Sequence, residues 1–157
     1  MGDNEEIVLT PIGYRELNDE LERLRTTERR EVADRIRDAI TYGELTENSE
    51  YEDAKNAQAF LEGRIQYLEN ILRSSKIIEN TGKTDEVRLG SLVTIVEEGA
   101  QEEEVYSIVG AAEANPREGK ISHESPIGAA LLGHRKGDKV RAKTPGGDMI
   151  FKIKSIK

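Results

Sequence analysis

Residues 43–51, Gly-Glu-Leu-Thr-Glu-Asn-Ser-Glu-Tyr, form an acidic segment between two long stretches with helical periodicity. Gly43 is a favourable stop for the first helix. The second helix is expected to begin near Asn48 or Ser49, because Ser49 and Glu52 have the spacing of a capping box. Two helices joined by so short a bend must run antiparallel. The segment therefore predicts the tip of a helical hairpin, at about residues 42–49.

The first helix of this hairpin is expected from Thr10 to Tyr42. Thr10 is a good N-cap, and Pro11 suits the first helical position because its missing N–H is not needed there. Apolar residues recur in steps of three and four along both helices, apart from a gap at Thr27 and Glu28. Each helix spans roughly 30 residues, so the hairpin should project about 45 Å. The predicted seam comprises Leu17, Leu21, Leu24, Val32, Ile36 and Ala39 or Ile40, followed by Tyr51, Ala54, Gln58, Leu61, Ile65, Leu68 and Leu72.

The helical periodicity is lost near residue 80, and residues 80–84 are the predicted linker. Beyond it, β-branched residues and turn signals predict a small twisted sheet with one short helix. The predicted fold class is therefore α+β, with an N-terminal coiled-coil hairpin in residues 1–79 and a C-terminal domain in residues 85–157. The strands are expected at 91–96, 104–109, 139–142 and 149–156, and the helix at 125–133.

The composition excludes several classes of function. A formal net charge of −8 argues against binding duplex nucleic acid through an extended basic face. The absence of Cys excludes disulfides, thiolate catalysis and the usual structural zinc sites. No apolar run approaches the roughly 20 residues that cross a bilayer, and the N-terminus lacks a signal-peptide pattern. We expect a cytoplasmic protein.

The acidic tip offers two carboxylates on one face. Glu44 and Glu47 are three residues apart, and such a pair suits Mg²⁺, which takes one or two protein carboxylates and keeps its other positions for water or phosphate. From the spacing alone, a solubilising hairpin tip is the favoured interpretation. A metal site of this kind would need a second macromolecule to complete it.

Basic residues on the hairpin arms form a second candidate site. They could line a nucleic-acid strand, but interspersed acidic residues favour a salt-bridged helix surface. The two histidines, His123 and His134, have no neighbouring ligands in the sequence and do not predict a zinc site. The basic residues are Arg29, Arg30, Arg35, Arg37, Lys55 and Arg64.

Motifs in both halves resemble those of the bacterial Gre transcript-cleavage factors, and more the GreA type than GreB. The resemblance extends from about Leu9 to Ile156, with the motifs in the same order. In the N-terminal half the resemblance rests on residues 43–51, Ala54-Lys55, Gln58 and 62–65. In the C-terminal half they are 121–122, 125–128, 130–133, 137–138 and 144–147.

This resemblance implies a hairpin that enters the secondary channel of RNA polymerase and a C-terminal domain of FKBP-like topology that docks at the channel rim. It implies that Glu44 and Glu47 help hold the second Mg²⁺ of the polymerase active site, with Asn48, Ser49 and Tyr51 supporting the tip. The chain itself would not be an enzyme and would bind no cofactor alone. Its role would be to stimulate the polymerase's own cleavage of backtracked RNA.

Further residues receive roles from the same resemblance. Lys55 and Arg37 would lie near the 3′ end of the extruded RNA. The implied partners are therefore RNA polymerase and backtracked RNA, with no membrane, and we expect a monomer. The polymerase-gripping surface would include Ser125, Pro126, Ile127 and Gly128.

One departure leaves an alternative open. Family members usually carry Asp where this chain has Glu44, and a longer side chain alters the reach of the carboxylate. The chain could thus be a channel-binding regulator that inhibits or modulates the polymerase without promoting cleavage. A free-standing prolyl isomerase is less well supported, because the C-terminal half offers only Tyr106 and Phe151 for an aromatic pocket. A coiled-coil scaffold is a further possibility.

Overall fold

The computed structural model describes residues 6–42, 49–80 and 85–157. The described chain forms two compact units. The first is the hairpin unit, Arg15–Ser74, and the second combines the described residues up to Tyr14 with Ser75–Lys157. The second unit is called the globular unit below. None of the helices in the described part of the chain combines the length and the hydrophobicity of a transmembrane helix.

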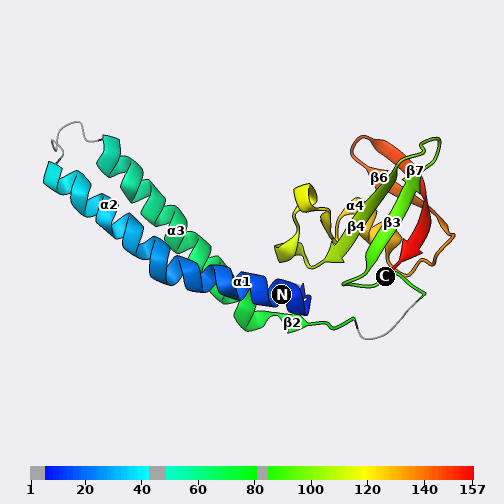
Figure 1. Cartoon of the computed structure of the whole chain (residues 1–157), viewed down its shortest axis with the longest axis horizontal. Helices are drawn as coiled ribbons and strands as arrows, with labels where there is room; N and C mark the ends of the chain where they lie inside the picture. The colour runs from blue at the N-terminus through cyan, green and yellow to red at the C-terminus, as the bar shows by residue number, and fades with distance from the viewer. Residues whose placement is uncertain (1–5, 43–48, 81–84) are drawn as a thin grey trace, which may run out of the picture. The chain divides into compact units, whose positions relative to one another are not determined.

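The hairpin has a first arm of three consecutive helical segments and a second arm formed by one long antiparallel helix (Figure 1). The expected helical hairpin is confirmed. The sequence did not predict that the middle segment of the first arm is a π-helix, which lies where the apolar spacing breaks at Thr27 and Glu28. The segments are α1 (Pro11–Arg23), η1 (Leu24–Glu28), α2 (Arg29–Tyr42) and α3 (Ser49–Ser74).

The hairpin core follows the predicted seam with one shift. Ala39 is buried, whereas Ile40 is half exposed at 52%. Near the end of α3, Ile71 is buried and Leu72 is only half-buried, so the seam has moved by one residue from the predicted position. The seam residues that are buried as expected are Leu17, Leu21, Leu24, Ala39, Ala54, Leu61, Ile65 and Leu68.

The globular unit is built on a five-stranded sheet in the order β5-β4-β3-β7-β6, with antiparallel neighbours except for the parallel pair β4 and β5 (Figure 1). The short helix α4 (Pro126–Leu131) packs against β5 and β6. The core of the globular unit contains Leu131, Phe151 and Ile153, which are nearly inaccessible to solvent. The expected α+β class is confirmed. The strands are β3 (Leu92–Glu97), β4 (Glu103–Val109), β5 (Lys120–Ser122), β6 (Lys139–Thr144) and β7 (Gly147–Ile156).

Two features of the globular unit were not predicted. Strand β5 was not predicted, because its three residues are too few to show a clear alternation of apolar and polar side chains. A parallel pair of two-residue strands, β1 (Val8–Leu9) and β2 (Lys76–Ile77), joins segments that are far apart in the sequence. Short 3₁₀ turns, η2 (Ala111–Glu113) and η3 (Pro116–Glu118), follow β4.

The Glu113 carboxylate holds the start of α1 within the globular unit. Its Oε2 accepts hydrogen bonds from the backbone N–H groups of Thr10 and Gly110, both at 3.0 Å, and its Oε1 accepts one from the Thr10 hydroxyl. The Thr10 hydroxyl also accepts a bond from the Gly13 N–H at 3.0 Å, which confirms the predicted N-cap. One acidic side chain thus connects the helix cap with the turn after β4.

Candidate functional site

The predicted tip joins the end of α2 to the start of α3. Glu44, Glu47 and Asn48 lie outside the described residues. Of the supporting residues, Ser49 is the exposed first residue of α3 and Tyr51 is half-buried on the first turn. The described helices therefore define both ends of the segment that carries the two predicted metal-binding carboxylates.

Acidic residues continue into the first turn of α3. Glu50 and Glu52 are exposed there, where the positive end of the helix dipole favours negative charge. Glu50 also lines a polar depression of about 420 Å³ with Asp38, Asp53 and Arg35. Among residues 6–42, 49–80 and 85–157, no group of three or more His, Asp or Glu side chains could hold a metal ion.

The two residues predicted to lie near RNA have different surroundings. Lys55 is exposed, and its Nζ lies 6.0 Å from the centre of the Tyr51 ring and 3.5 Å from Gln58 Oε1. Both contacts are weak, so the ammonium group can reach a ligand. Arg37 is also exposed, but its Nη2 donates to Asp34 Oδ1 at 2.6 Å. A phosphate would have to compete with this carboxylate for Arg37.

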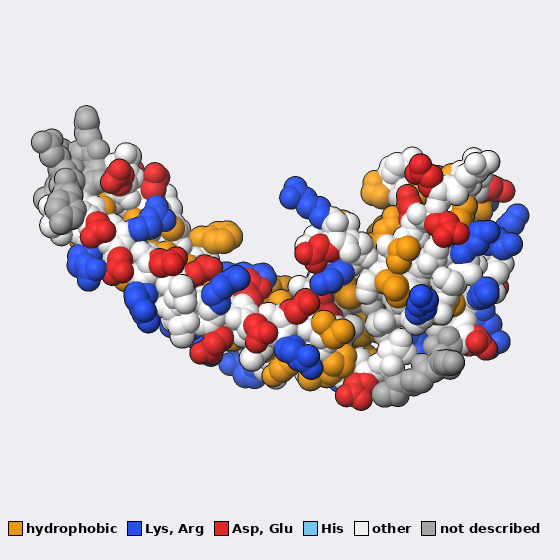
Figure 2. Space-filling view, viewed as in Figure 1, with side chains coloured by type: hydrophobic (Ala, Val, Ile, Leu, Met, Phe, Trp, Pro, Cys, Tyr) orange, Lys and Arg blue, Asp and Glu red, His pale blue; other side chains and the backbone are white. Residues whose placement is uncertain are grey.

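Three other basic side chains of the hairpin, Arg25, Arg29 and Arg64, form ion pairs between the arms. Arg29 donates two hydrogen bonds of 2.8 Å to Glu62, which raise the pKa of the guanidinium and lower the pKa of the Glu62 carboxyl. Arg64 makes a similar fork with Glu20, and that hydrogen bonding raises the pKa of Arg64. Figure 2 shows acidic and basic side chains interspersed along the hairpin. The arrangement is that of a salt-bridged surface.

The predicted polymerase-gripping residues lie at the start of α4. Ser125 caps the helix, because its Oγ accepts a hydrogen bond from the Gly128 N–H at 3.1 Å and donates one to the Ser122 carbonyl at 2.7 Å. A Cβ on Gly128 would lie 2.0 Å from that carbonyl oxygen, so the backbones approach too closely for any other residue. Pro126 is exposed, and Ile127 is half-buried against the core.

Ser125 and Gly128 thus shape the turn. Pro126 and the outer part of Ile127 are the groups that a partner could contact.

Two family models cover nearly the whole chain. The model described as transcription elongation factor, N-terminal, matches residues 7–77, and that described as transcription elongation factor, GreA/GreB, C-term, matches residues 82–157. The chain belongs to the GreA/GreB family of transcription elongation factors. The resemblance found in the motifs is thereby confirmed.

Individual relatives match this chain over nearly its whole length. Transcription elongation factor GreA of Bacillus licheniformis is 52% identical over 149 residues, which cover 94% of each chain. Transcription elongation factor GreA of Geobacillus kaustophilus is 50% identical over 158 residues and covers 100% of both chains. Among solved structures, GreA factor homolog 1 of Thermus thermophilus is 35% identical, covers 98% of this chain and 99% of its own, and superposes with a TM-score of 0.45.

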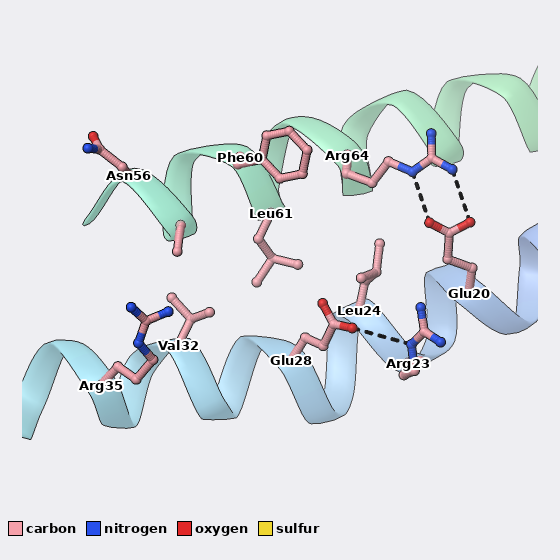
Figure 3. Close-up of a pocket in the computed structure, with 11 residues that line it drawn as sticks. Glu20, Arg23, Leu24, Glu28, Val32, Arg35, Asn56, Phe60, Leu61 and Arg64 are labelled. Carbon is pink, nitrogen blue, oxygen red and sulfur yellow. Dashed lines mark hydrogen bonds and ion pairs between the residues drawn. The ribbon is translucent and has the colours of Figure 1, made fainter. Parts of the chain in front are cut away.

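The hairpin carries a groove that its sequence does not predict. It has a volume of about 840 Å³ and lies between the first arm and α3, beside Phe60 (Figure 3). Phe60 falls outside the predicted seam, and the only signal for the groove was the gap at Thr27 and Glu28. Its apolar lining includes Leu24, Val32, Ala57, Phe60 and Leu61.

Proposed function

We propose that this chain binds RNA polymerase, inserts its hairpin into the secondary channel and stimulates cleavage of backtracked RNA. The observation that carries the proposal is the antiparallel pair α2 and α3, joined by a segment that bears Glu44 and Glu47, in a chain of the GreA/GreB family. A slender pair of helices can enter a channel that excludes a globular domain. The chain then acts as an accessory factor and the polymerase performs the hydrolysis.

In this proposal the tip delivers negative oxygen atoms to the polymerase active site. Glu44 and Glu47 are oxygen donors of the kind that Mg²⁺ prefers, and two carboxylates leave the other positions for polymerase and RNA groups. With a second Mg²⁺ held there, the site would supply two-metal chemistry, in which one ion activates the attacking water and the other stabilises the leaving oxygen. Asn48, Ser49 and Tyr51 would hold the tip in shape for this task.

The other residues predicted to form sites would bind RNA or polymerase and would take no part in the cleavage reaction. Lys55 is the freer of the two cations and would contact the phosphates of the extruded RNA. Arg37 would contribute less because Asp34 already binds it. Pro126 and Ile127 would contact the channel rim, on a turn held in shape by Ser125.

The second candidate is a regulator that occupies the channel without promoting cleavage. It is favoured by one observation, the Glu44 side chain, which is one methylene longer than the Asp usual in this family. A misplacement of about 1 Å can reduce a rate roughly 100-fold. Glu44→Asp separates the two functions: a large gain in cleavage supports the inhibitor, and little change supports the cleavage factor.

The proposal is tested with backtracked elongation complexes in the presence of Mg²⁺. The wild-type protein should shorten the RNA from its 3′ end. Glu47→Ala should lose roughly 100-fold in cleavage rate, the scale expected when one group that stabilises a transition state is removed. Glu31→Ala, which removes an exposed carboxylate from α2, is the matched control and should cleave like the wild type. Failure of the wild type to shorten RNA, or equal rates for all three proteins, would refute the proposal.

A further inference from the structure

Positive charge is concentrated in one segment of this acidic chain. Residues 135–157 contain eight Lys and Arg against two Asp and Glu, whereas the whole chain has a formal net charge of −8. A local excess of basic residues in an acidic protein is typical of a surface that binds an anionic polymer. The whole-chain charge argues against an extended basic face, so such a surface has to be compact.

The strands β6 and β7 place five of these cations on the solvent side of the sheet. Successive side chains of a strand point to opposite faces. Val140, Ala142 and Ile153, which alternate with the basic residues, are at most 3% exposed in the core, and the basic side chains are exposed. This surface is called the basic face below, and it comprises Lys139, Arg141 and Lys143 on β6 with Lys152 and Lys154 on β7.

The cations of the basic face are not neutralised within the described part of the chain. No carboxylate there lies within ion-pair distance of any of them, not even Asp148, which lies opposite Lys143 in the ladder. Lys139 lies directly opposite Lys152, and like charges in such a pair destabilise a sheet. Packing of the sheet therefore does not explain these charges.

Protection of the sheet edge explains only part of the basic face. Cations on an edge strand hinder pairing with the edge of another sheet. The strand β6 is an edge strand, but β7 lies between β3 and β6. Lys152 and Lys154 therefore have no role in protecting an edge, and a ligand would account for all five cations together.

Carboxylates border the basic face on the β3 side. Glu97 and Glu98 line a depression of about 250 Å³ together with Lys139, Lys152 and Lys154. On the opposite side is the free edge of the sheet, where β6 carries three cations at successive outward positions, roughly 6.8 Å apart at 3.4 Å per residue. An anionic ligand is therefore expected to lie along β6, away from β3.

The chemistry of the basic face fits a nucleic-acid backbone. Cations at regular intervals match a polymer that carries one negative charge on each nucleotide. The only aromatic residue on β6 and β7 is the buried Phe151, so the face offers no platform on which unpaired bases could stack. Contacts to phosphates alone carry no sequence information. In a family of transcription elongation factors, the ligand that these properties favour is duplex DNA.

We infer that the basic face binds the phosphate backbone of duplex DNA through Lys139, Arg141, Lys143 and Lys152, without reading the sequence. The inference does not depend on the proposed stimulation of RNA cleavage. Electrostatic attraction of this kind would keep the factor close to transcribed DNA.

The test measures binding of the full-length protein, without polymerase, to a short labelled DNA duplex by fluorescence anisotropy. With four phosphate contacts, affinity should fall roughly 100-fold between about 50 and 200 mM salt, a slope of about −3.6 in a double-logarithmic plot. Lys139→Gln combined with Arg141→Gln should reduce the slope to about −1.8. Arg30→Gln combined with Arg117→Gln is the matched control, because it removes the same charge from exposed positions outside β6 and β7, and it should keep the wild-type slope.

Folding of the basic-face variant is checked by urea denaturation. The variant should be at least as stable as the wild type, because it separates no ion pair and removes the opposed charges of Lys139 and Lys152.

Three results would overturn the inference. If the wild type and both double variants show the same salt slope, the basic face does not bind DNA. If single-stranded RNA of the same length binds more tightly than the duplex, RNA is the ligand. If sedimentation at low salt shows a self-association of the wild type that the basic-face variant lacks, a second copy of the chain occupies the face.

Discussion

Gly13→Ala should destabilise the globular unit because of a single acidic side chain. A Cβ at position 13 would lie 1.5 Å from Oε1 of Glu113 and 2.0 Å from its Cδ. The carboxylate must then leave its place, and it loses the hydrogen bonds from the Thr10 N–H, the Thr10 hydroxyl and the Gly110 N–H. Glycine at this position thus provides the space in which Glu113 binds the helix cap.

The size of the effect follows from these three bonds. At roughly 1 kcal/mol each, they account for a loss of about 3 kcal/mol. Ala recovers up to about 1 kcal/mol over Gly as a helix former. The net destabilisation should be about 2 kcal/mol. Gly63→Ala is the matched control, because Gly63 lies within α3 with no atom within 4 Å of its added Cβ, and it should stabilise the protein by about 0.5–1 kcal/mol.

Urea unfolding followed by circular dichroism measures both variants, and a double-mutant cycle identifies the cause. In a Glu113→Ala background the clash partner is absent, so Gly13→Ala should be neutral or slightly stabilising. A penalty of about 2 kcal/mol that persists in that background would refute the reasoning. An equal response of Gly13→Ala and Gly63→Ala in the otherwise wild-type protein would refute it as well.

Three further predictions concern the globular unit. Ser125→Ala removes the side-chain cap of the Gly128 N–H and should cost about 0.5–2 kcal/mol of unfolding free energy, measured by urea denaturation; no change would contradict the capping role. Phe151→Ala should cost about 3–5 kcal/mol in the same assay because it empties a filled core, and a cost below about 1 kcal/mol would contradict that packing. Burial, with help from the hydrogen bond to Glu104, raises the pKa of Tyr106 to about 12, so the stability linked to its neutral form is present below pH 10 and is lost as the pH rises through about 12. The wild type should therefore lose more stability between pH 9 and 11 than Tyr106→Phe, whereas equal losses would show that Tyr106 titrates normally.

The hairpin was predictable because its determinants are local. Thr10 and Pro11 mark the start of the first arm, Ser49 marks the start of α3, and steps of three and four place the seam. The shift from Leu72 to Ile71 shows the limit of this reasoning, since a helix of this length can rotate slightly without breaking its pattern.

The features that escaped prediction depend on contacts between distant residues. Two-residue strands such as β1 and β2 are too short to show a periodicity. The residues that pair are separated in the sequence by the whole hairpin. The requirement for Gly at position 128 arises only when the Ser122 carbonyl is in place. The groove beside Phe60 depends on the π-helix, and the gap in apolar spacing at Thr27 and Glu28 does not by itself predict a π-helix.

The Mg²⁺ dependence of RNA cleavage tests the central proposal most directly. Glu47→Gln keeps the size of the side chain and removes the charge that would bind the ion. With saturating factor on backtracked complexes, the variant should need a Mg²⁺ concentration about 10-fold or more higher for half-maximal cleavage, and high Mg²⁺ should restore part of the rate. An identical half-maximal Mg²⁺ concentration for the wild type and Glu47→Gln would contradict a role of the hairpin tip in holding magnesium.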